Sequence, residues 1–244
     1  IIKGTQTKDL ELIFKEVNLN KITPSVKRFN FDGNLNGTVF FKQNNSVYQP
    51  NANLKIDNLE VNDNFLGTLL LDISGDDSLS KFKINSEIIN ENLNYFKAEG
   101  NLEVQNQNTF LDIDLYFKKF NLGILSNLGD DVLSNIRGFA SGTARINGNV
   151  NDLDYNGRLF VDDVGLTIPY LNVDYVISNN SVIDVTKDKF IIRRTKLQDT
   201  KLKTEGFLQG IIQHEQFGKW QLDLDISASR LLALNTKDSE DAAY

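Results

Sequence analysis

The chain repeats itself at a fixed offset of 105 residues (142 minus 37). Glycines, leucines and acidic residues coincide across this offset: Gly37 with Gly142, Leu54 with Leu159, Asp57 with Asp162 and Leu66 with Leu171. The apolar positions between these residues keep the same phase in both copies. A repeat of this length made of strands is typical of an elongated, repetitive architecture, in which function resides in a continuous surface.

Strand signals dominate both copies. In residues 109–118, leucine, isoleucine and phenylalanine alternate with aspartate and tyrosine, and residues 220–228 repeat this alternation. Shorter segments of the same kind lie at 53–56, 81–84, 101–104, 143–146 and 189–192. Because successive side chains of a strand point to opposite faces, this pattern predicts strands with one apolar and one wet face. Turns rich in Asn, Asp and Gly separate about a dozen such strands.

The repeat defines the expected organisation. We expect residues 1–244 to be a single elongated β-repeat segment of a longer chain, since the chain contains no methionine and has no initiator. Its units are expected at 12–114 and 115–229, with 230–244 forming a tail or opening the next unit. The fold class is therefore predicted to be all-β.

A corner interrupts the alternation at the same place in both units. The apolar phase steps by three residues across Asp57-Asn58 and again across Asp162-Asp163. A bulge or sharp bend at these points keeps the same face apolar. The repeated corner predicts a β-sheet folded lengthwise. One further irregularity, at 122–136, has apolar residues spaced by three and four, which leaves a helical turn and a continued strand as equal alternatives.

Composition excludes several classes of function. There are no cysteines, so disulfides, thiolate metal sites and cysteine nucleophiles are absent. The net charge is −7 and the basic residues are dispersed, so nucleic acid is not an expected partner. No apolar run approaches the roughly 20 residues of a membrane-spanning helix.

The residue types that form catalytic or binding sites in other proteins lack the required sequence context in this chain. His214 is the only histidine, and no nucleophile motif accompanies it, so we expect a histidine in a turn or at a strand end. The acidic pairs at 76–77, 130–131 and 162–163 do not fit a calcium loop and are expected in turns. Asp112 and Asp114 are expected to solvate the outer face of their strand. The glycines at 33–37 and 138–142 lack the context of a phosphate loop and predict bulges and close backbone approach. No catalytic residue, metal site or cofactor is expected.

The apolar strand face is what remains. In a sandwich this face is simply the core, whereas in an open, folded sheet it forms an accessible apolar trough. Alternation by itself leaves both alternatives open.

Residues 136–175 resemble the TamB family of translocation and assembly module proteins, within the AsmA-like superfamily. The segment IRGFASGTARINGNVNDLDYNGRLFVDDVGLTIPYLNVDY follows that family's order of glycines, a short polar turn and a GLxIPxL unit. The similarity continues through 190–228 and extends weakly to 12–75 through the internal repeat. The resemblance implies an elongated, lengthwise-folded β-sheet, a half-pipe or β-taco, with an apolar interior.

The resemblance also implies a function. Such a chain is expected in the periplasm, as part of a protein that is anchored in the inner membrane and reaches the outer membrane. It would be a lipid-transfer bridge rather than an enzyme, and would bind phospholipid acyl chains in its groove. The alternative is a scaffold for outer membrane protein assembly. The implied protein partner is a BamA- or TamA-like outer membrane barrel, reached through regions outside this chain.

The inward phase of the alternation predicts which residues line the groove. These residues are Leu54, Ile56, Leu59, Val61, Leu102, Val104, Leu111, Ile113, Leu115, Phe117, Ile146, Leu159, Val161, Leu166, Ile168, Leu222, Leu224 and Ile226.

Overall fold

The computed structural model describes residues 8–23, 29–44, 47–90, 95–105, 108–128, 132–215 and 218–235. Within these ranges the chain is almost entirely β-strand, interrupted by three short 3-10 helices. The all-β prediction is therefore confirmed. In the same ranges, no helix is long and apolar enough to span a membrane.

The elements follow one another without long connections. The first half of the chain forms β1 (Lys8–Asn18), η1 (Leu19–Lys21), β2 (Phe31–Asn44), β3 (Val47–Val61), β4 (Asn64–Gly75), β5 (Lys81–Ile89), β6 (Tyr95–Gln105), β7 (Asn108–Asn121) and η2 (Leu122–Leu128). The second half forms β8 (Ser134–Asn149), β9 (Asp152–Ile168), η3 (Pro169–Leu171), β10 (Val173–Ile177), β11 (Ser181–Thr186), β12 (Lys189–Asp199), β13 (Glu205–Glu215) and β14 (Gly218–Arg230).

The fourteen strands of the described ranges form one antiparallel sheet. Neighbours in the sheet are neighbours in the chain, except that β10 pairs with β12 while β11 pairs with β12 and β9. Tight turns make this order possible. Asn62 and Asp63, for example, have φ values of 50° and 60° between β3 and β4, as a type I′ hairpin turn requires.

The chain divides into two compact units. The first unit comprises residues 1–120 and 143–156, and the second comprises 121–142 and 157–244. Strands β8 and β9 contribute residues to both units. The proposed repeat boundaries at 12–114 and 115–229 remain a prediction.

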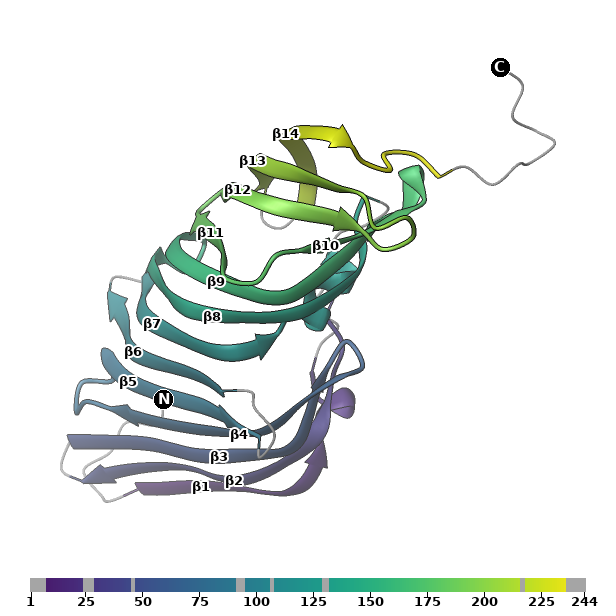
Figure 1. Ribbon diagram of the computed structural model, residues 1–244. Coiled ribbons are helices and arrows are strands. Elements are labelled where there is room, and N and C mark those ends of the chain that lie inside the picture. The colour runs from purple at the N-terminus through teal and green to yellow at the C-terminus, as the bar shows by residue number, and fades with distance from the viewer. Residues whose placement is uncertain are drawn as a thin grey trace. The chain divides into compact units, whose positions relative to one another are not determined.

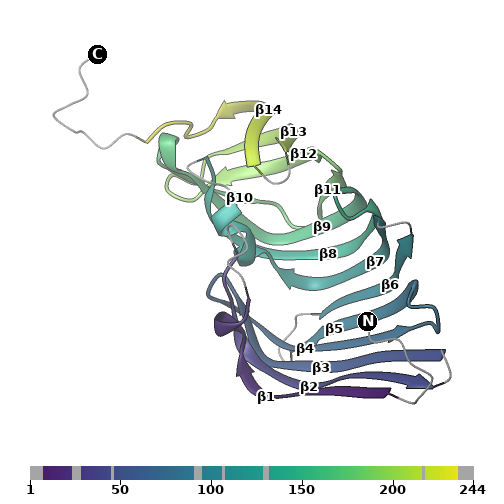
Figure 2. The same ribbon diagram turned by 180° about the vertical axis from the view of Figure 1, so that it is seen from behind.

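In the first unit, β1 to β4 carry irregularities along one line and turn there (Figures 1 and 2). Residues with positive φ mark this line, namely Glu16, Gly33, Asn58 and Gly67. The pairing register shifts between Phe14 and Val17 in β1 and between Ile56 and Leu59 in β3. The predicted bulge at Asp57-Asn58 is therefore confirmed.

In the second unit Asp163 has a φ of 53° and its backbone lies against Gly138. The predicted bulge at this place remains a prediction. Asp162 and Asp163 lie within β9 rather than in a turn, so the expectation of a turn is wrong for this pair. Asp76 does lie in a turn, and its carboxylate accepts hydrogen bonds from the Ser80 and Lys81 amides at 2.9 and 3.1 Å. Asp130 and Asp131 lie outside the described residues. The helical alternative within 122–136 is confirmed by η2.

Candidate apolar binding surfaces

Strand pairing aligns the apolar residues of the first unit into rows that cross β1 to β7. One row contains Leu12, Val39, Ala52, Ile73, Ile84, Gly100 and Ile113. The next contains Val17, Leu35, Ile56, Leu69, Ile88, Phe96 and Phe117. A third row, between these two, contains Gly37, Leu54, Leu71, Ser86, Ala98 and Leu115. One face of the first unit is thus apolar across seven strands.

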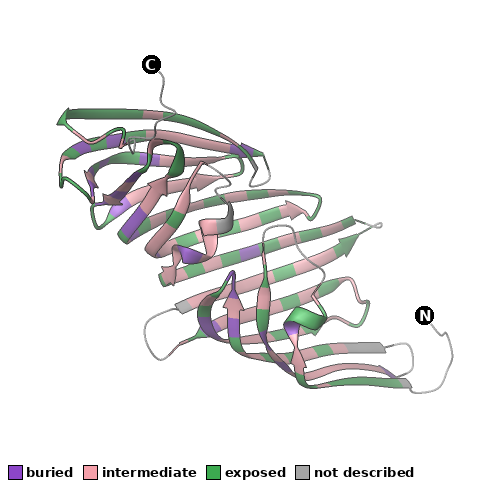
Figure 3. Ribbon diagram, turned by 90° about the vertical axis from the view of Figure 1, so that its right-hand side faces the viewer, coloured by how far each residue is buried: buried purple, intermediate pink, exposed green. Residues whose placement is uncertain are grey.

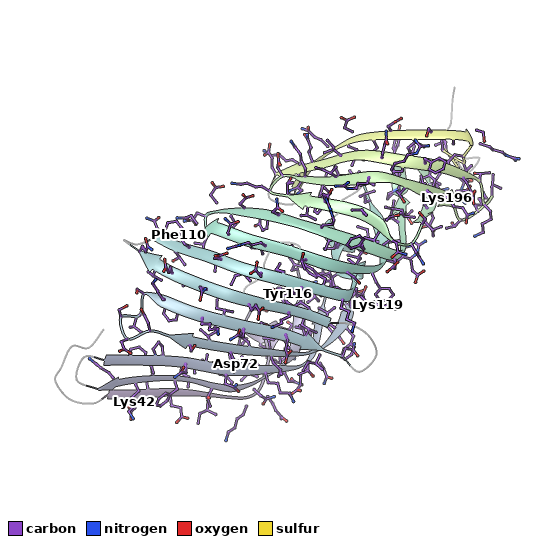
Figure 4. The ribbon with its side chains drawn as sticks, turned by 60° about the vertical axis from the view of Figure 1, so that its left-hand side comes forward. Lys42, Asp72, Phe110, Tyr116, Lys119 and Lys196 are labelled. Atoms are coloured by element: carbon purple, nitrogen blue, oxygen red, sulfur yellow. The ribbon has the colours of Figure 1, made fainter. Side chains whose placement is uncertain are left out.

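The opposite face of the first unit is polar. One of its rows contains Thr38, Asn53, Asp72, Asn85, Glu99 and Asp114. Asp72 and Tyr116 are labelled on this face in Figure 4. Arg145 of β8 forms a bidentate ion pair with the exposed Asp112, in which both N–O distances are 2.7 Å. The expectation that Asp112 and Asp114 solvate the outer face is therefore confirmed.

The apolar face of the first unit is only partly covered. Leu54, Ile73 and Ile84 are half-buried, and Leu12 of β1 is 48% exposed. Half-buried and exposed residues alternate along the strands (Figure 3). Full burial occurs at Ile113 and toward the bulged ends of the strands, where Leu59, Val61 and Leu66 lie. The middle of this face therefore remains within reach of solvent or a ligand.

The predicted groove residues of the first unit differ in burial. Leu59, Val61 and Ile113 are buried, and Val104 is 40% exposed. The half-buried ones are Leu54, Ile56, Leu102, Leu111, Leu115, Phe117 and Ile146. Register places Leu102 opposite Leu111 and Leu54 opposite Leu71, so these residues share the apolar face.

The second unit covers its apolar face more completely. A buried cluster contains Ala140, Val161, Val164, Val173, Tyr175, Ile177, Ile192, Leu197 and Leu208. Val161 is 1% exposed and Leu197 is 2% exposed. The apolar face of this unit is thus largely covered, because η2 and other non-strand segments add side chains on the apolar side.

Beside this cluster lies a cavity of about 190 Å³ that is lined only by apolar residues. Its walls are Leu122, Leu125, Leu133, Ile136, Ala140, Leu159, Val161, Val164, Leu166, Ile177, Ile183, Phe190, Ile192, Ile212 and Trp220. η2 supplies Leu122 and Leu125, while the sheet supplies most of the others. A cavity with no polar wall favours a hydrocarbon group over water, which needs several polar partners.

Sequence reasoning located part of this cavity. The predicted residues Leu159, Val161 and Leu166 line it. Ile168 and Leu224 pack against the buried cluster, whereas Leu222 and Ile226 are 41% and 45% exposed. The contributions of η2 and Trp220 were missed. The three- and four-residue apolar spacing at 122–136 was the available signal for η2, since it marks a helical apolar stripe.

His214 lies near the end of β13, as expected, and is buried beside the aromatic end of the cavity. Its ring centroid lies 5.2 Å from that of Phe190 and 5.4 Å from that of Trp220. Burial lowers the pKa of His214, and the nearby Asp188 carboxylate opposes this shift only in part. A neutral imidazole among aromatic rings is typical of packing.

Polar groups elsewhere are engaged in structural bonds. A depression of about 350 Å³ in the first unit includes Asp32, Glu60 and Asp63 in its walls. The Asp32 carboxylate accepts hydrogen bonds from the Gly33 amide at 2.6 Å and from Asn18 at 3.1 Å. Among the described residues, no group of three His, Cys, Asp or Glu side chains is arranged to hold a metal ion.

Comparison with known proteins adds no assignment. No protein-family model, curated protein or solved structure matches this chain.

Proposed function

We propose that this chain binds the acyl chains of phospholipids on its apolar strand face and forms part of a lipid-transfer bridge. The observation that carries the proposal is the apolar face of each unit. In the first unit it runs across seven strands and is only half-covered, and in the second it encloses a wholly apolar cavity. Both features favour a hydrocarbon ligand.

The energetics of such a ligand fit this surface. Each methylene group of an acyl chain that leaves water contributes about 0.8 kcal/mol, so a long apolar face lowers the cost of moving a lipid. The charged residues of the opposite face remain in water, and a headgroup has no need to enter the apolar side. We also propose that the sheet of each unit is folded lengthwise along its line of bulges, as a half-pipe with an apolar interior. The positive φ values at Gly33 and Asn58 and at Gly138 and Asp163 support this fold.

The resemblance of residues 136–175 to the TamB family supports a place for this bridge in the periplasm. There the full protein would be anchored in the inner membrane and would reach the outer membrane, with a BamA- or TamA-like barrel as partner through regions outside this chain. We propose no catalytic role for any residue, and no cofactor.

A scaffold for outer membrane protein assembly is the second candidate. It is favoured by the edge strand β1, which pairs only with β2 among the described strands and exposes Leu10, Leu12 and Ile13. Such an edge offers free backbone groups on which a client strand can add to the sheet.

Photo-crosslinking in cells tests the two candidates. A photoreactive residue is placed at the inward Leu54, Ile113, Leu159 or Leu224, and in matched controls at the outward Asp112 or Asp223. The adducts are then identified by mass spectrometry. Phospholipid adducts from inward positions only are expected for the bridge. Client polypeptide adducts from those positions, without lipid, would overturn the bridge in favour of assembly.

A further inference from the structure

After β14 the chain leaves the sheet and runs beside η3 (Figures 1 and 2). Residues 231–235, here named the strap, form no ladder with any strand. Hydrogen bonds hold the strap instead. The Leu232 amide donates to the Thr204 hydroxyl at 2.8 Å, and the Tyr175 hydroxyl donates to the Leu232 carbonyl at 2.8 Å. The second residue of the strap is therefore attached to the middle of β10 and to the residue that precedes β13.

The end of the strap is attached by Asn235. The backbone amide of Asn235 donates a hydrogen bond to the Leu171 carbonyl at 3.0 Å. Asn235 and Asn172 also exchange bonds, each side-chain amide donating to the other's backbone carbonyl, at 2.6 and 3.1 Å. The Lys201 ammonium donates to the Asn235 side-chain oxygen at 2.6 Å. These partners come from two separate segments, residues 171–172 and the turn that contains Lys201, so the bonds specify one position for the end of the strap.

The strap also covers apolar surface. Leu231 and Leu232 pack against the buried cluster of the second unit, while Ala233 and Leu234 point to solvent. Leu231 lies over Gly206, where an added Cβ would be 3.5 Å from its Cδ2. The strap thus occupies part of the apolar face as a ligand would, with side chains from the protein's own chain.

The strap adjoins the cavity. Tyr175, which bonds the strap, and Ile177, which lines the cavity, are successive inward residues of β10. The cavity of about 190 Å³ exceeds the ~150 Å³ that accommodates benzene, but it is smaller than the roughly 300 Å³ at which drug-sized sites begin. It therefore holds a short apolar group, whereas a long acyl chain requires apolar surface beyond its present walls.

We propose that the strap is an autoinhibitory segment that competes with long acyl chains for the apolar face of the second unit. With the strap in place, only short apolar groups enter the cavity. With the strap displaced, the surface beneath Leu231 and Leu232 extends the site so that it accepts a long chain. This inference rests on the proposed lipid function, and it adds a mechanism that selects ligands by length.

A disulfide lock tests the strap in the full chain. The double variant Asn172→Cys with Asn235→Cys joins two residues that already exchange hydrogen bonds, and the cysteine-free chain makes the pairing unambiguous. The oxidised protein is expected to bind cis-parinaric acid, a long-chain fluorescent fatty acid, about tenfold more weakly than the same protein after reduction. Benzene, measured by NMR, is expected to bind both forms equally because it fits the existing cavity. The reduced form controls for any effect of the substitutions on folding.

A second variant is expected to favour the displaced strap, whereas the disulfide favours the attached strap. Tyr175→Phe keeps the buried ring but removes the bond to Leu232, and is expected to tighten cis-parinaric acid binding about threefold to tenfold. Tyr170→Phe is the matched control, since Tyr170 is 89% exposed and makes no bond to the strap. In the wild-type chain, saturating fatty acid is expected to speed hydrogen exchange at the Leu232 and Asn235 amides at least tenfold. The Thr195 amide, in the β12–β13 ladder, serves as the reference.

The outcomes separate the strap from the lipid function. If oxidised and reduced forms bind cis-parinaric acid equally, and the strap amides keep their exchange rates, the strap inference is overturned while the lipid function stands. If no form binds the fatty acid, both are overturned.

Discussion

The two units use the same backbone features at corresponding positions. Gly37 and Gly142 both have positive φ, of 126° and 145°. A Cβ at either glycine would overlap a carbonyl oxygen of the neighbouring strand, that of Asn53 in the first unit and of Arg158 in the second. Both pairs are related by the 105-residue offset (158 minus 53). The repeat is therefore one of backbone geometry as well as of sequence.

The two units differ in what covers the apolar face. In the second unit, η2 and residues 231–235 add leucines over the sheet, and Val161 and Leu197 are almost completely buried. In the first unit, η1 is three residues long, and Ile73 and Ile84 remain half-buried. Similar strands thus produce a packed core in one unit and a partly open surface in the other, because short non-strand segments decide the coverage.

The largest expected effect comes from truncating a side chain in the packed unit. Leu197→Ala is expected to lower the free energy of unfolding of the second unit by about 2–5 kcal/mol, because it leaves a cavity that the surroundings fill only partly. Trp220 is the only tryptophan and belongs to the second unit, so its fluorescence during urea unfolding measures this change.

Leu54→Ala is the matched change in the first unit. Leu54 is half-buried, so about 1–2 kcal/mol of stabilisation is expected to be lost there, measured by amide exchange in β3 and β4. The Trp220 transition should shift by less than about 0.5 kcal/mol. If both variants shift the Trp220 transition equally, the division into a packed and an open unit is wrong.

Glycine substitutions test the backbone geometry that the two units share. Gly37→Ala and Gly142→Ala are each expected to destabilise their own unit by about 1–3 kcal/mol, because both positions combine positive φ with backbone overlap. Amide exchange of the flanking strands measures each loss. Gly148→Ala is the control, since its φ is also positive but its added Cβ would lie 3.1 Å from the nearest atom. Unequal losses at Gly37 and Gly142 would show that the repeated geometry has different roles.

Much of the fold followed from local pattern. Period-2 alternation predicted the strands, because a strand with one covered face needs apolar residues at every second position. The three-residue step at Asp57-Asn58 predicted the bulge in β3, because only an extra residue restores the phase. These signals lie within a single strand, so one sequence contains them in full.

The candidate site was less accessible to this reasoning. Alternation identified Leu159 and Val161 as inward, but it contains no information on what lies over them. The cover comes from η2 and from residues 231–235, which reach the apolar face through long-range packing and through bonds such as that between Tyr175 and Leu232. Leu222, Leu224 and Ile226 share one face of β14, the last strand of the sheet, yet only Leu224 packs against the buried cluster.

Ion pairs provide a smaller contrast between the units. In the second unit Arg137 forms a bidentate ion pair with Asp174, with N–O distances of 2.8 and 2.7 Å. The Arg137 guanidinium lies against Gly165, and the Asp174 side chain is 27% exposed. In the first unit both Arg145 and Asp112 are more than half exposed. Arg137→Ala is expected to cost about 1–3 kcal/mol and Arg145→Ala about 0.2–1 kcal/mol.

Unfolding at low and high salt tests this contrast. The contribution of Arg145 should largely disappear at 1 M salt, where exposed charges are screened, whereas that of Arg137 should persist in part. Equal losses for the two variants would mean that the partial burial of the Arg137–Asp174 pair does not strengthen its contribution to stability.

The smallest expected effect is a pH dependence confined to the second unit. Burial lowers the pKa of His214 below its ordinary value of 6.5, with Asp188 opposing the shift, so the folded state favours the neutral imidazole. The unfolded chain binds the proton more readily. The contribution of His214 to stability is therefore complete above about pH 6.5 and is lost as the pH falls from there through the lowered pKa.

The fluorescence of Trp220 during unfolding should report this loss, because the centroid of the Trp220 ring lies 5.4 Å from that of the imidazole. His214→Phe should remove the dependence in that window, because His214 is the only histidine, while amide exchange in the first unit, corrected for its intrinsic pH dependence, stays flat. A slope that persists in His214→Phe would assign the titration to a carboxylate and remove this difference between the units.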